Sequence, residues 1–253
     1  KSSYIVSSLT EKSGKRQPQP PFITSTLQRE AATRLGFTVR KTMQVAQSLY
    51  EGVELGNQGP VGLITYMRTD STRIAPEAQQ EALKYIKDRY GKNYCPDKPR
   101  VYARKGKGVQ DAHEAIRPSY VDKAPETIRQ YLSNDQMKVY KLIWERFMAS
   151  QMSACELLTR TAEIDAGPGV FRASSTDVTF PGFTIVYSVA IRPTDESESA
   201  KQQDGESDAT DGAEQEAATT LPDGIKKGEE LKLKELLKGQ HFTQPLPRYN
   251  EAS

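Results

Sequence analysis

The sequence predicts an α+β protein in which a mainly helical domain is inserted into a discontinuous β-rich domain. Three observations support this class: a β-like start, helical periodicity through the middle of the chain, and alternating apolar and polar residues towards its end. We expect residues 1–22 and 153–247 to form the β-rich domain, 23–152 the helical domain, and 248–253 to begin another domain. A chain of 253 residues has room for one large or two modest domains.

The β-rich domain is predicted from short runs of β-forming residues. Residues 4–6 form the first run, and a polar, proline-rich passage follows from Lys12 to Pro21. The later runs alternate in polarity and are separated by Gly, Pro and an acidic stretch; they cover residues 158–164, 170–173, 183–189 and 231–237.

Two helices are predicted directly after Pro21. The first has a capping-box pattern that begins at Ser25, and Gly36 is placed to end it. Thr38 can cap the second helix, which Gly52 ends. The spacing of the second helix predicts one apolar face, formed by Val39, Met43, Ala46 and Tyr50.

The remaining elements of the helical domain are a short strand and three helices. Residues 61–67 follow a turn-like Gly- and Pro-containing passage and predict a strand. Helices are expected to start at Pro76, Pro125 and Asn134. The last of them carries a broad apolar stripe, formed by Tyr140, Ile143, Trp144 and Phe147.

The net charge of +2 averages two unlike parts of the chain. Residues 194–216 hold nine acidic residues and one lysine, which leaves a net charge of +10 on the rest. The acidic stretch has no large apolar residue, so burial cannot offset the entropy of ordering it. We expect a disordered insertion over 194–218, or alternatively an acidic interaction segment. The basic remainder indicates an anionic partner.

The sequence excludes a protein with a transmembrane helix and a protein stabilised by a disulfide framework. No run of 18 apolar residues is present, and the first residues lack the apolar core of a signal peptide. Cys95 and Cys155 lie sixty residues apart, which fits neither a disulfide framework nor a zinc site and favours a reducing cytoplasm. Because it opens at Lys1 and stops at Ser253 without a closing element, we expect the chain to be part of a longer polypeptide.

A Tyr-x-Arg motif is the strongest candidate for chemistry. In strand geometry Tyr66 and Arg68 lie on one face. A free tyrosine is almost wholly protonated at neutral pH, and a neighbouring guanidinium favours the phenolate and binds phosphate oxygens. The hydroxyl and carboxylate groups of Thr69, Asp70 and Ser71 can organise the following turn. An exposed aromatic ring beside a solvated cation is the alternative.

A histidine motif and a basic loop follow. His113 lies between two carboxylates, and Arg117 stands where H-E-x-x-H would need a second histidine, which excludes a zinc protease. His113 can hydrogen-bond a phosphate or serve as a structural histidine. Five cations with an interleaved tyrosine lie between residues 98 and 107 and suit either a phosphate-contacting or a solvated loop.

These motifs resemble those of type IA DNA topoisomerases. Residues 62–72 resemble the family's active-site tyrosine motif, and residues 112–119 its histidine motif. Residues 21–52 resemble the segment leading into the catalytic domain, and residues 241–253 the passage into the DNA-binding domain. Met67, where topoisomerase III enzymes typically have proline, favours the bacterial topoisomerase I branch.

The resemblance implies that Tyr66 attacks single-stranded DNA to form a 5′-phosphotyrosine, and that negatively supercoiled DNA is thereby relaxed in the cytoplasm, at the nucleoid. It implies that Arg68 stabilises the phosphate and His113 positions it, and that the β-rich domain forms an arch which the tyrosine-bearing domain can swing away from. The residues implied to contact DNA are Thr65, Thr69, Asp70, Ser71, Arg100, Arg104, Lys105, Lys107, Arg117 and Arg248.

The resemblance also implies a Mg²⁺ site in a Toprim module with an Asp-x-Asp pattern. No two aspartates of this chain lie two positions apart. We therefore expect this chain to bind no Mg²⁺ and to be inactive without the Toprim module and the rest of the DNA-binding domain. Two alternatives remain: a non-catalytic single-stranded nucleic-acid-binding module, and a scaffold that acts through its acidic stretch.

Overall fold

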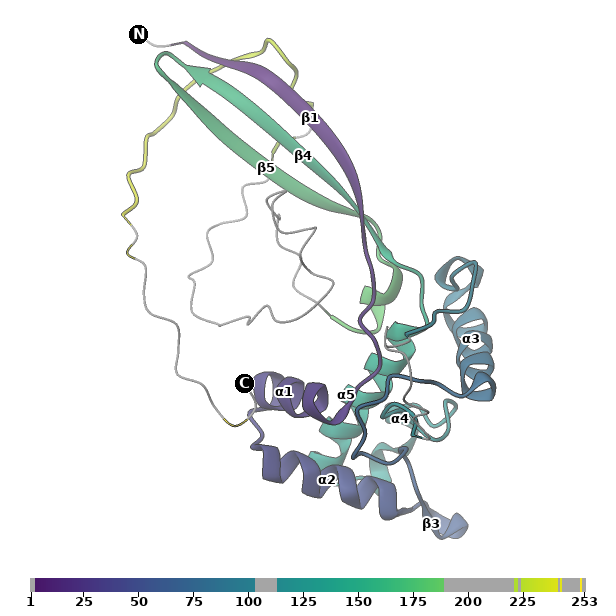
Figure 1. The fold of residues 1–253 in the computed structure, drawn as a ribbon. Coiled ribbons are helices and arrows are strands. Elements are labelled where there is room, and N and C mark those ends of the chain that lie inside the picture. Colours follow the sequence, from purple (N-terminus) through teal and green to yellow (C-terminus); the bar gives the residue numbers. More distant parts are fainter. Residues whose placement is uncertain are drawn as a thin grey trace, which may run out of the picture. The chain divides into compact units, whose positions relative to one another are not determined.

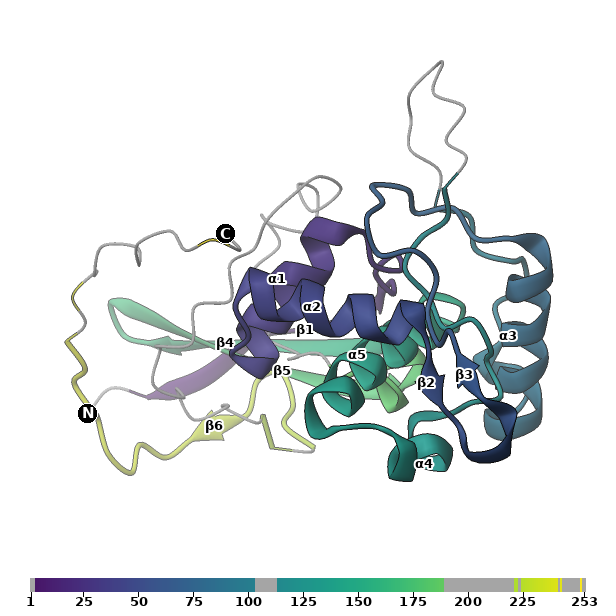
Figure 2. The same cartoon turned by 90° about the horizontal axis from the view of Figure 1, so that it is seen from below.

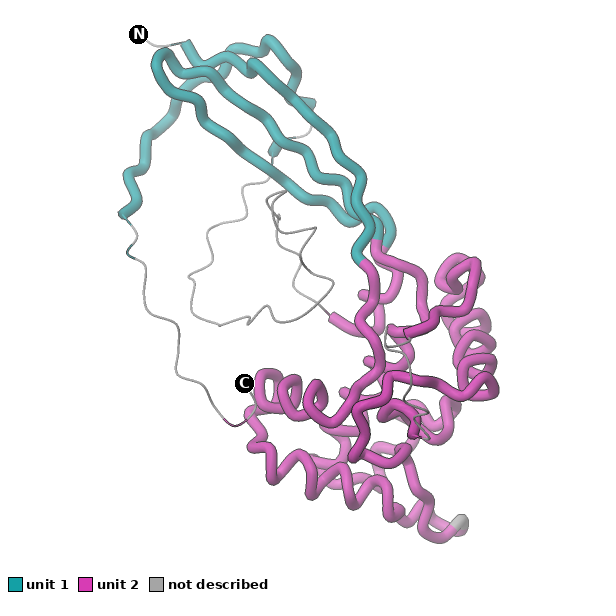
Figure 3. The backbone as a smooth tube through the Cα atoms, in the orientation of Figure 1, with its two compact units in different colours: residues 1–16, 156–180, 189–248 teal, residues 17–155, 181–188, 249–253 magenta. Residues whose placement is uncertain are grey.

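The computed structural model describes residues 3–102, 113–188, 221–222, 224–240, 242 and 251. The chain divides into two compact units (Figure 3). A β unit comprises residues 1–16, 156–180 and 189–248, and a helical unit comprises residues 17–155, 181–188 and 249–253. The predicted acidic insertion and residues 103–112 of the basic loop lie outside the described residues.

The described residues of the helical unit form five helices and a small hairpin (Figure 1). The longest helix, α5, packs against α1, α2 and α4. Figure 2 shows the β2–β3 hairpin beyond the end of α2. The elements are α1 (Thr24–Leu35), α2 (Val39–Glu51), β2 (Val53–Glu54), β3 (Pro60–Val61), α3 (Pro76–Tyr90), α4 (Pro125–Ile128) and α5 (Asn134–Ser150), with 3₁₀ turns η1 (Gly56–Gln58), η2 (Lys92–Tyr94), η3 (Arg129–Tyr131) and η4 (Gly182–Ile185).

Four helices begin at the residues predicted from capping groups or first-turn prolines, and α1 does not. The Thr38 hydroxyl accepts a hydrogen bond from the Lys41 amide at 3.2 Å, as predicted for α2. The capping box predicted to begin at Ser25 is wrong, because the N-cap position of α1 lies two residues earlier and the helix starts at Thr24. The amide of the N-cap residue, Ile23, donates to the Thr26 hydroxyl at 3.0 Å.

The apolar faces decide how the helices pack. The predicted stripe of α5 is confirmed, since all four of its residues are at most 4% exposed. The predicted face of α2 is wrong at its C-terminal end: Leu49 is fully buried, whereas Tyr50 is 41% exposed. Leu49 therefore anchors the last turn of α2 in the core, and the ring of Tyr50 stays at the surface.

Among the described residues of the β unit, four strands form a sheet in the order β5-β4-β1-β6. Its strands are β1 (Tyr4–Arg16), β4 (Cys155–Ala166), β5 (Gly169–Phe180) and β6 (Glu230–Leu231). β4 and β5 form a long antiparallel hairpin in which Thr161 pairs with Ser174, and their hydroxyls lie 3.1 Å apart. The helices and strands together agree with the predicted α+β class.

Three strand predictions are corrected. β1 runs to Arg16 rather than ending before the polar passage. The run at 183–189 is wrong: η4 replaces a strand, because Gly182 adopts φ +50° and Phe183 is 2% exposed, packed in the helical unit. Of the run at 231–237, only Leu231 is in a strand, β6; residues 232–240 are non-regular and mostly exposed.

The unit boundaries differ slightly from the predicted domain limits. Residues 17–22 belong to the helical unit rather than the β unit. Phe22 is fully buried there and forms a β-bridge with Ile116, which explains the assignment. Residues 181–188 join the same unit through Phe183 and Tyr187, each 2% exposed.

Within the described residues, no helix is long and apolar enough to span a bilayer.

Candidate active site

The segment that carries Tyr66 is held by backbone hydrogen bonds from two sides. The Leu63 amide donates to the Leu49 carbonyl of α2 at 2.8 Å, and the Ser119 amide donates to the Leu63 carbonyl at 2.9 Å. A β-bridge joins Ile64 to Pro118. The predicted strand over 61–67 is therefore wrong beyond Val61, because the segment pairs only in single bridges and not in a ladder.

The burial pattern nevertheless presents Tyr66 and Arg68 to solvent. Leu63, Ile64 and Met67 are at most 2% exposed and fix the segment to the core of the helical unit. Tyr66 is 40% exposed, and Arg68 is also exposed. Both side chains of the Tyr-x-Arg motif thus face solvent, although the local backbone is not the regular strand on which the prediction of a shared face was based.

Thr65 brings the histidine motif to the tyrosine. Its hydroxyl donates to the Ala115 carbonyl at 2.7 Å and accepts from the Arg117 amide at 3.0 Å. The Thr65 amide donates to the Arg117 carbonyl at 2.9 Å. These bonds place the exposed His113 ring 6.3 Å from the Tyr66 ring, centroid to centroid. Thr65, predicted to contact DNA, therefore acts here as the link between the two motifs.

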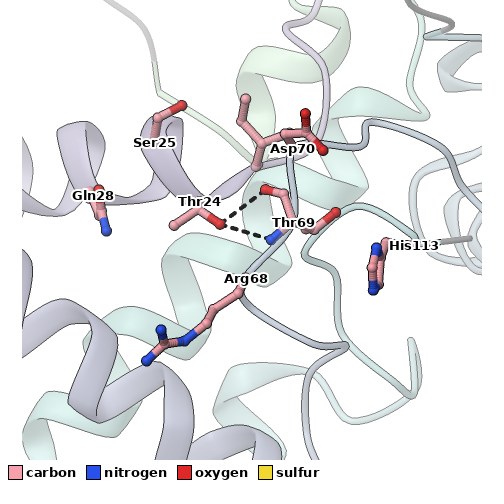
Figure 4. A pocket seen from close by; sticks show the side chains of 8 residues that line it. Thr24, Ser25, Gln28, Arg68, Thr69, Asp70 and His113 are labelled. Carbon is pink, nitrogen blue, oxygen red and sulfur yellow. Dashed lines mark hydrogen bonds between the residues drawn. The ribbon is translucent and has the colours of Figure 1, made fainter. Parts of the chain in front are cut away.

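Thr24 fixes the other end of the segment. Its hydroxyl lies 2.8 Å from the Met67 carbonyl oxygen and accepts a hydrogen bond from the Thr69 amide at 2.9 Å (Figure 4). Its amide donates to the Thr69 carbonyl, also at 2.9 Å. Because Thr24 is the first residue of α1, these bonds join the N-terminus of that helix to residues 67–69.

The turn after Arg68 is built by hydroxyl groups, as predicted. The Thr69 hydroxyl accepts from the Ser71 amide at 3.1 Å, and the Ser71 hydroxyl accepts from the Arg73 amide at 3.2 Å. Thr69 and Ser71 are each 7% exposed, so their side chains support the turn. Asp70 is exposed between them.

A cavity of about 470 Å³ opens beside the motif. In Figure 4 the Arg68 guanidinium and the His113 ring lie apart, on either side of Thr69. Two nitrogen-rich side chains that line one cavity can contact the oxygens of a phosphate backbone. The lining residues are Ile23, Thr24, Ser25, Gln28, Arg68, Thr69, Asp70 and His113.

Other residues predicted to contact DNA have different surroundings. Arg117 donates twice to one Glu114 carboxylate oxygen, at 2.8 Å each, and is 13% exposed. The Arg100 guanidinium donates to the Met152 carbonyl at 2.7 Å and to the Gln17 side chain at 2.8 Å. The Arg117 side chain is therefore bound within its own segment, whereas that of Arg100 joins residues 17 and 152. The predicted contacts Arg104, Lys105, Lys107 and Arg248 lie outside the described residues.

One neighbour of the tyrosine was not predicted as a site residue. The Tyr50 ring lies 5.4 Å from the Tyr66 ring, centroid to centroid, at an interplanar angle of 65°. Helical spacing had suggested that Tyr50 belonged to the apolar face of α2. The hydrogen bond between Leu49 and Leu63 shows that the end of α2 lies against the segment that carries Tyr66.

Comparisons with known proteins identify the family of this chain. The family model described as DNA topoisomerase matches residues 1–253. DNA topoisomerase 1 from two strains of Xylella fastidiosa, Temecula1 and 9a5c, is 46% identical over 249 residues, 98% of this chain. Full-length topoisomerase I from Thermotoga maritima matches with a TM-score of 0.66 and 38% identity, over 77% of this chain and 31% of that one. The chain spans 28% of the length of its Xylella relatives.

Proposed function

We propose that Tyr66 breaks and rejoins single-stranded DNA. The premise is that this chain belongs to the DNA topoisomerase family, in its type IA, bacterial topoisomerase I branch. The observation that carries the proposal is the exposed Tyr66 ring beside His113, with Arg68 on the adjoining cavity. The reaction would relax negatively supercoiled DNA, in the compartment where the DNA lies, the cytoplasm and its nucleoid.

The proposed step is a transesterification. The Tyr66 Oη attacks the phosphorus of a DNA phosphodiester, so that a bond from Oη to phosphorus forms and the bond from phosphorus to O3′ breaks. The phenol proton leaves Oη, and the released O3′ takes up a proton. The phosphotyrosine bond conserves the energy of the broken diester, so the reverse attack by the 3′ hydroxyl reseals the strand without ATP.

Arg68 and His113 have separate roles in this proposal. The permanent charge of Arg68 offsets the negative charge that develops on the phosphate oxygens in the transition state. His113 donates a hydrogen bond to the scissile or a neighbouring phosphate and so fixes the strand relative to Tyr66. Thr65 and Thr24 contribute indirectly, since they hold the backbone on either side of Tyr66.

Mg²⁺ remains part of the proposal, as the resemblance implied. The described residues do not fit its site, because none of them form a group of three or more His, Cys, Asp or Glu side chains close enough to hold a metal ion. We therefore propose that ligands outside this part of the chain bind Mg²⁺. We expect the isolated chain with Mg²⁺ not to relax supercoiled plasmid, and relaxation would contradict this.

The test uses a chimera in which residues 1–253 replace the matching segment of a Xylella relative. Single-stranded oligonucleotide and Mg²⁺ are added, and denaturing electrophoresis detects the covalent adduct. We expect the chimera to form the adduct, Tyr66→Phe to abolish it, and the control Tyr120→Phe, at another exposed tyrosine, to retain it. An adduct that survives Tyr66→Phe contradicts the proposal. The proposal is also contradicted if the chimera binds the oligonucleotide but forms no adduct, while the unmodified relative forms one. That result would indicate the non-catalytic binding module.

A further inference from the structure

We propose that Tyr50 is a positioning residue that orients the Tyr66 ring for its attack on phosphorus. This inference rests on the proposed function of Tyr66 and assigns a role to a residue that the mechanism above does not use. It starts from the edge-to-face contact between the two rings, with centroids 5.4 Å apart and ring planes at 65°.

The backbone fixes Tyr50 in this place. The last four carbonyl groups of a helix have no partner within the helix. In α2, the Leu49 carbonyl is satisfied by the Leu63 amide at 2.8 Å, only three residues before Tyr66. The last turn of α2 and the nucleophile segment are therefore joined by a hydrogen bond, and the Tyr50 ring projects from the joined turn.

Gly62 permits the segment that carries Tyr66 to approach the last turn of α2 closely. A Cβ atom at this position would lie 2.8 Å from the Tyr50 carbonyl oxygen, closer than side-chain and backbone atoms normally approach. Only glycine lets the nucleophile segment pass the end of α2 at this distance. Backbone contacts to Leu49 and Tyr50 thus fix the position of the Tyr50 backbone. The contact between the rings follows from that position.

Tyr66 benefits from such a neighbour because its own surroundings are open. Its ring is 40% exposed and sits in a segment without a regular strand ladder. An exposed tyrosine can rotate about two side-chain bonds, and attack requires its oxygen near the phosphorus and in line with the leaving O3′. An aromatic edge contact limits this rotation without occupying the phenol oxygen. Tyr50 therefore supplies orientation and leaves the nucleophile available.

The contact also predicts which property of Tyr50 matters. An edge-to-face contact depends on a ring and not on the hydroxyl group, so phenylalanine should replace Tyr50. Losing the ring should slow the chemical step, whereas binding of DNA should be unaffected. Aromatic pairs of this kind correspond to roughly a three- to tenfold effect on a rate or equilibrium.

The experiment measures two quantities in the chimera: the single-turnover rate of adduct formation at saturating oligonucleotide, and the Kd for the same oligonucleotide without Mg²⁺. We expect Tyr50→Leu to lower the rate roughly three- to tenfold with Kd unchanged, and Tyr50→Phe to keep both. Tyr50→Met is a second non-aromatic variant, used should the leucine variant unfold at a lower temperature. Tyr120→Leu, at another exposed tyrosine, is the matched control and should change neither quantity.

Each other outcome overturns the inference. An unchanged rate in Tyr50→Leu would show that the contact does not orient Tyr66, and an increased Kd with an unchanged rate would make Tyr50 a DNA-contact residue. A Tyr50→Phe rate as low as that of Tyr50→Leu would assign the effect to the hydroxyl group. In all three cases Tyr66→Phe would still abolish the adduct, so the proposed function would stand independently.

Discussion

The Thr24 hydroxyl and the Thr69 amide, 45 positions apart in the chain, form a 2.9 Å hydrogen bond that joins the N-terminus of α1 to the turn after Arg68. Thr69 is 7% exposed, so water cannot readily replace this partner. The position of Arg68 therefore depends on a helix that precedes it by more than thirty residues.

We expect Thr24→Val, which keeps the shape and removes the hydroxyl, to lower the free energy of unfolding by about 1–3 kcal/mol, since the buried Thr69 amide loses an acceptor. The same variant should slow adduct formation in the chimera. Urea unfolding and single-turnover rates measure the two effects, and Thr24→Ser should restore most of both. Thr127→Val is the control, because the exposed Thr127 bonds only within its own turn; an equal loss there would refute a specific role for Thr24.

Gly62→Ala tests the close approach of the segment that carries Tyr66 to α2. The new Cβ would lie 2.8 Å from the Tyr50 carbonyl oxygen, so the backbone must shift. We expect a loss of about 1–3 kcal/mol in the free energy of unfolding and slower adduct formation. Gly14→Ala is the control, since nothing lies within 4 Å of a Cβ there. Equal stability of both variants would show that the approach at Gly62 is not restrictive.

Arg68→Gln tests transition-state stabilisation. Arg68 is exposed, so the free energy of unfolding should change by less than about 0.5 kcal/mol. The single-turnover rate of adduct formation should fall by about 10²–10³-fold, because a charged donor to the reacting phosphate is lost. Arg129→Gln removes another exposed arginine, which donates to Asn134, and should leave the rate unchanged. A normal rate in Arg68→Gln would exclude the proposed role.

Because Tyr102 is buried, we expect the free energy of unfolding to fall at alkaline pH. Burial raises the pKa of Tyr102 to about 12, and its hydroxyl donates to the Ser150 carbonyl at 2.7 Å. Between the unfolded pKa of about 10 and the folded value, the unfolded chain binds fewer protons than the folded one, so stability falls as pH rises. Urea unfolding should show this loss between pH 9 and pH 12, which is roughly the window set by these pKa values. The free energy of unfolding should fall less steeply with pH in Tyr102→Phe than in Tyr120→Phe. Equal slopes in the two variants would contradict this assignment.

Much of the helical unit could be predicted from local sequence. The helices α2, α3 and α5 follow from capping residues, terminal glycines and apolar spacing, which act over a few residues. The same local rules predicted a strand wrongly at residues 61–67, because an apolar run has the pattern of a strand whether or not a partner strand exists. Here the run is buried by α2 and by residues 115–119, which supply single hydrogen bonds in place of a ladder.

The site was predictable in its residue types but not in its assembly. Tyr66, Arg68 and His113 could be singled out by their chemistry and by their order in the sequence. The proximity of Tyr66 and His113 depends on Thr65, whose hydroxyl reaches residues fifty positions away, and spacing carries no signal for such a contact. Tyr50 was assigned to an apolar face because helical periodicity cannot distinguish a core aromatic residue from one at the rim of a site.

The most direct test of the central claim is to identify the residue bonded to DNA. The chimera is trapped with a single-stranded oligonucleotide, digested with protease and nuclease, and analysed by mass spectrometry. We predict one modified peptide, which contains Tyr66 linked to the 5′ phosphate of the cleaved strand, and a free 3′ hydroxyl on the other product. A nucleotide on any other residue, or a linkage to the 3′ end, would contradict the account.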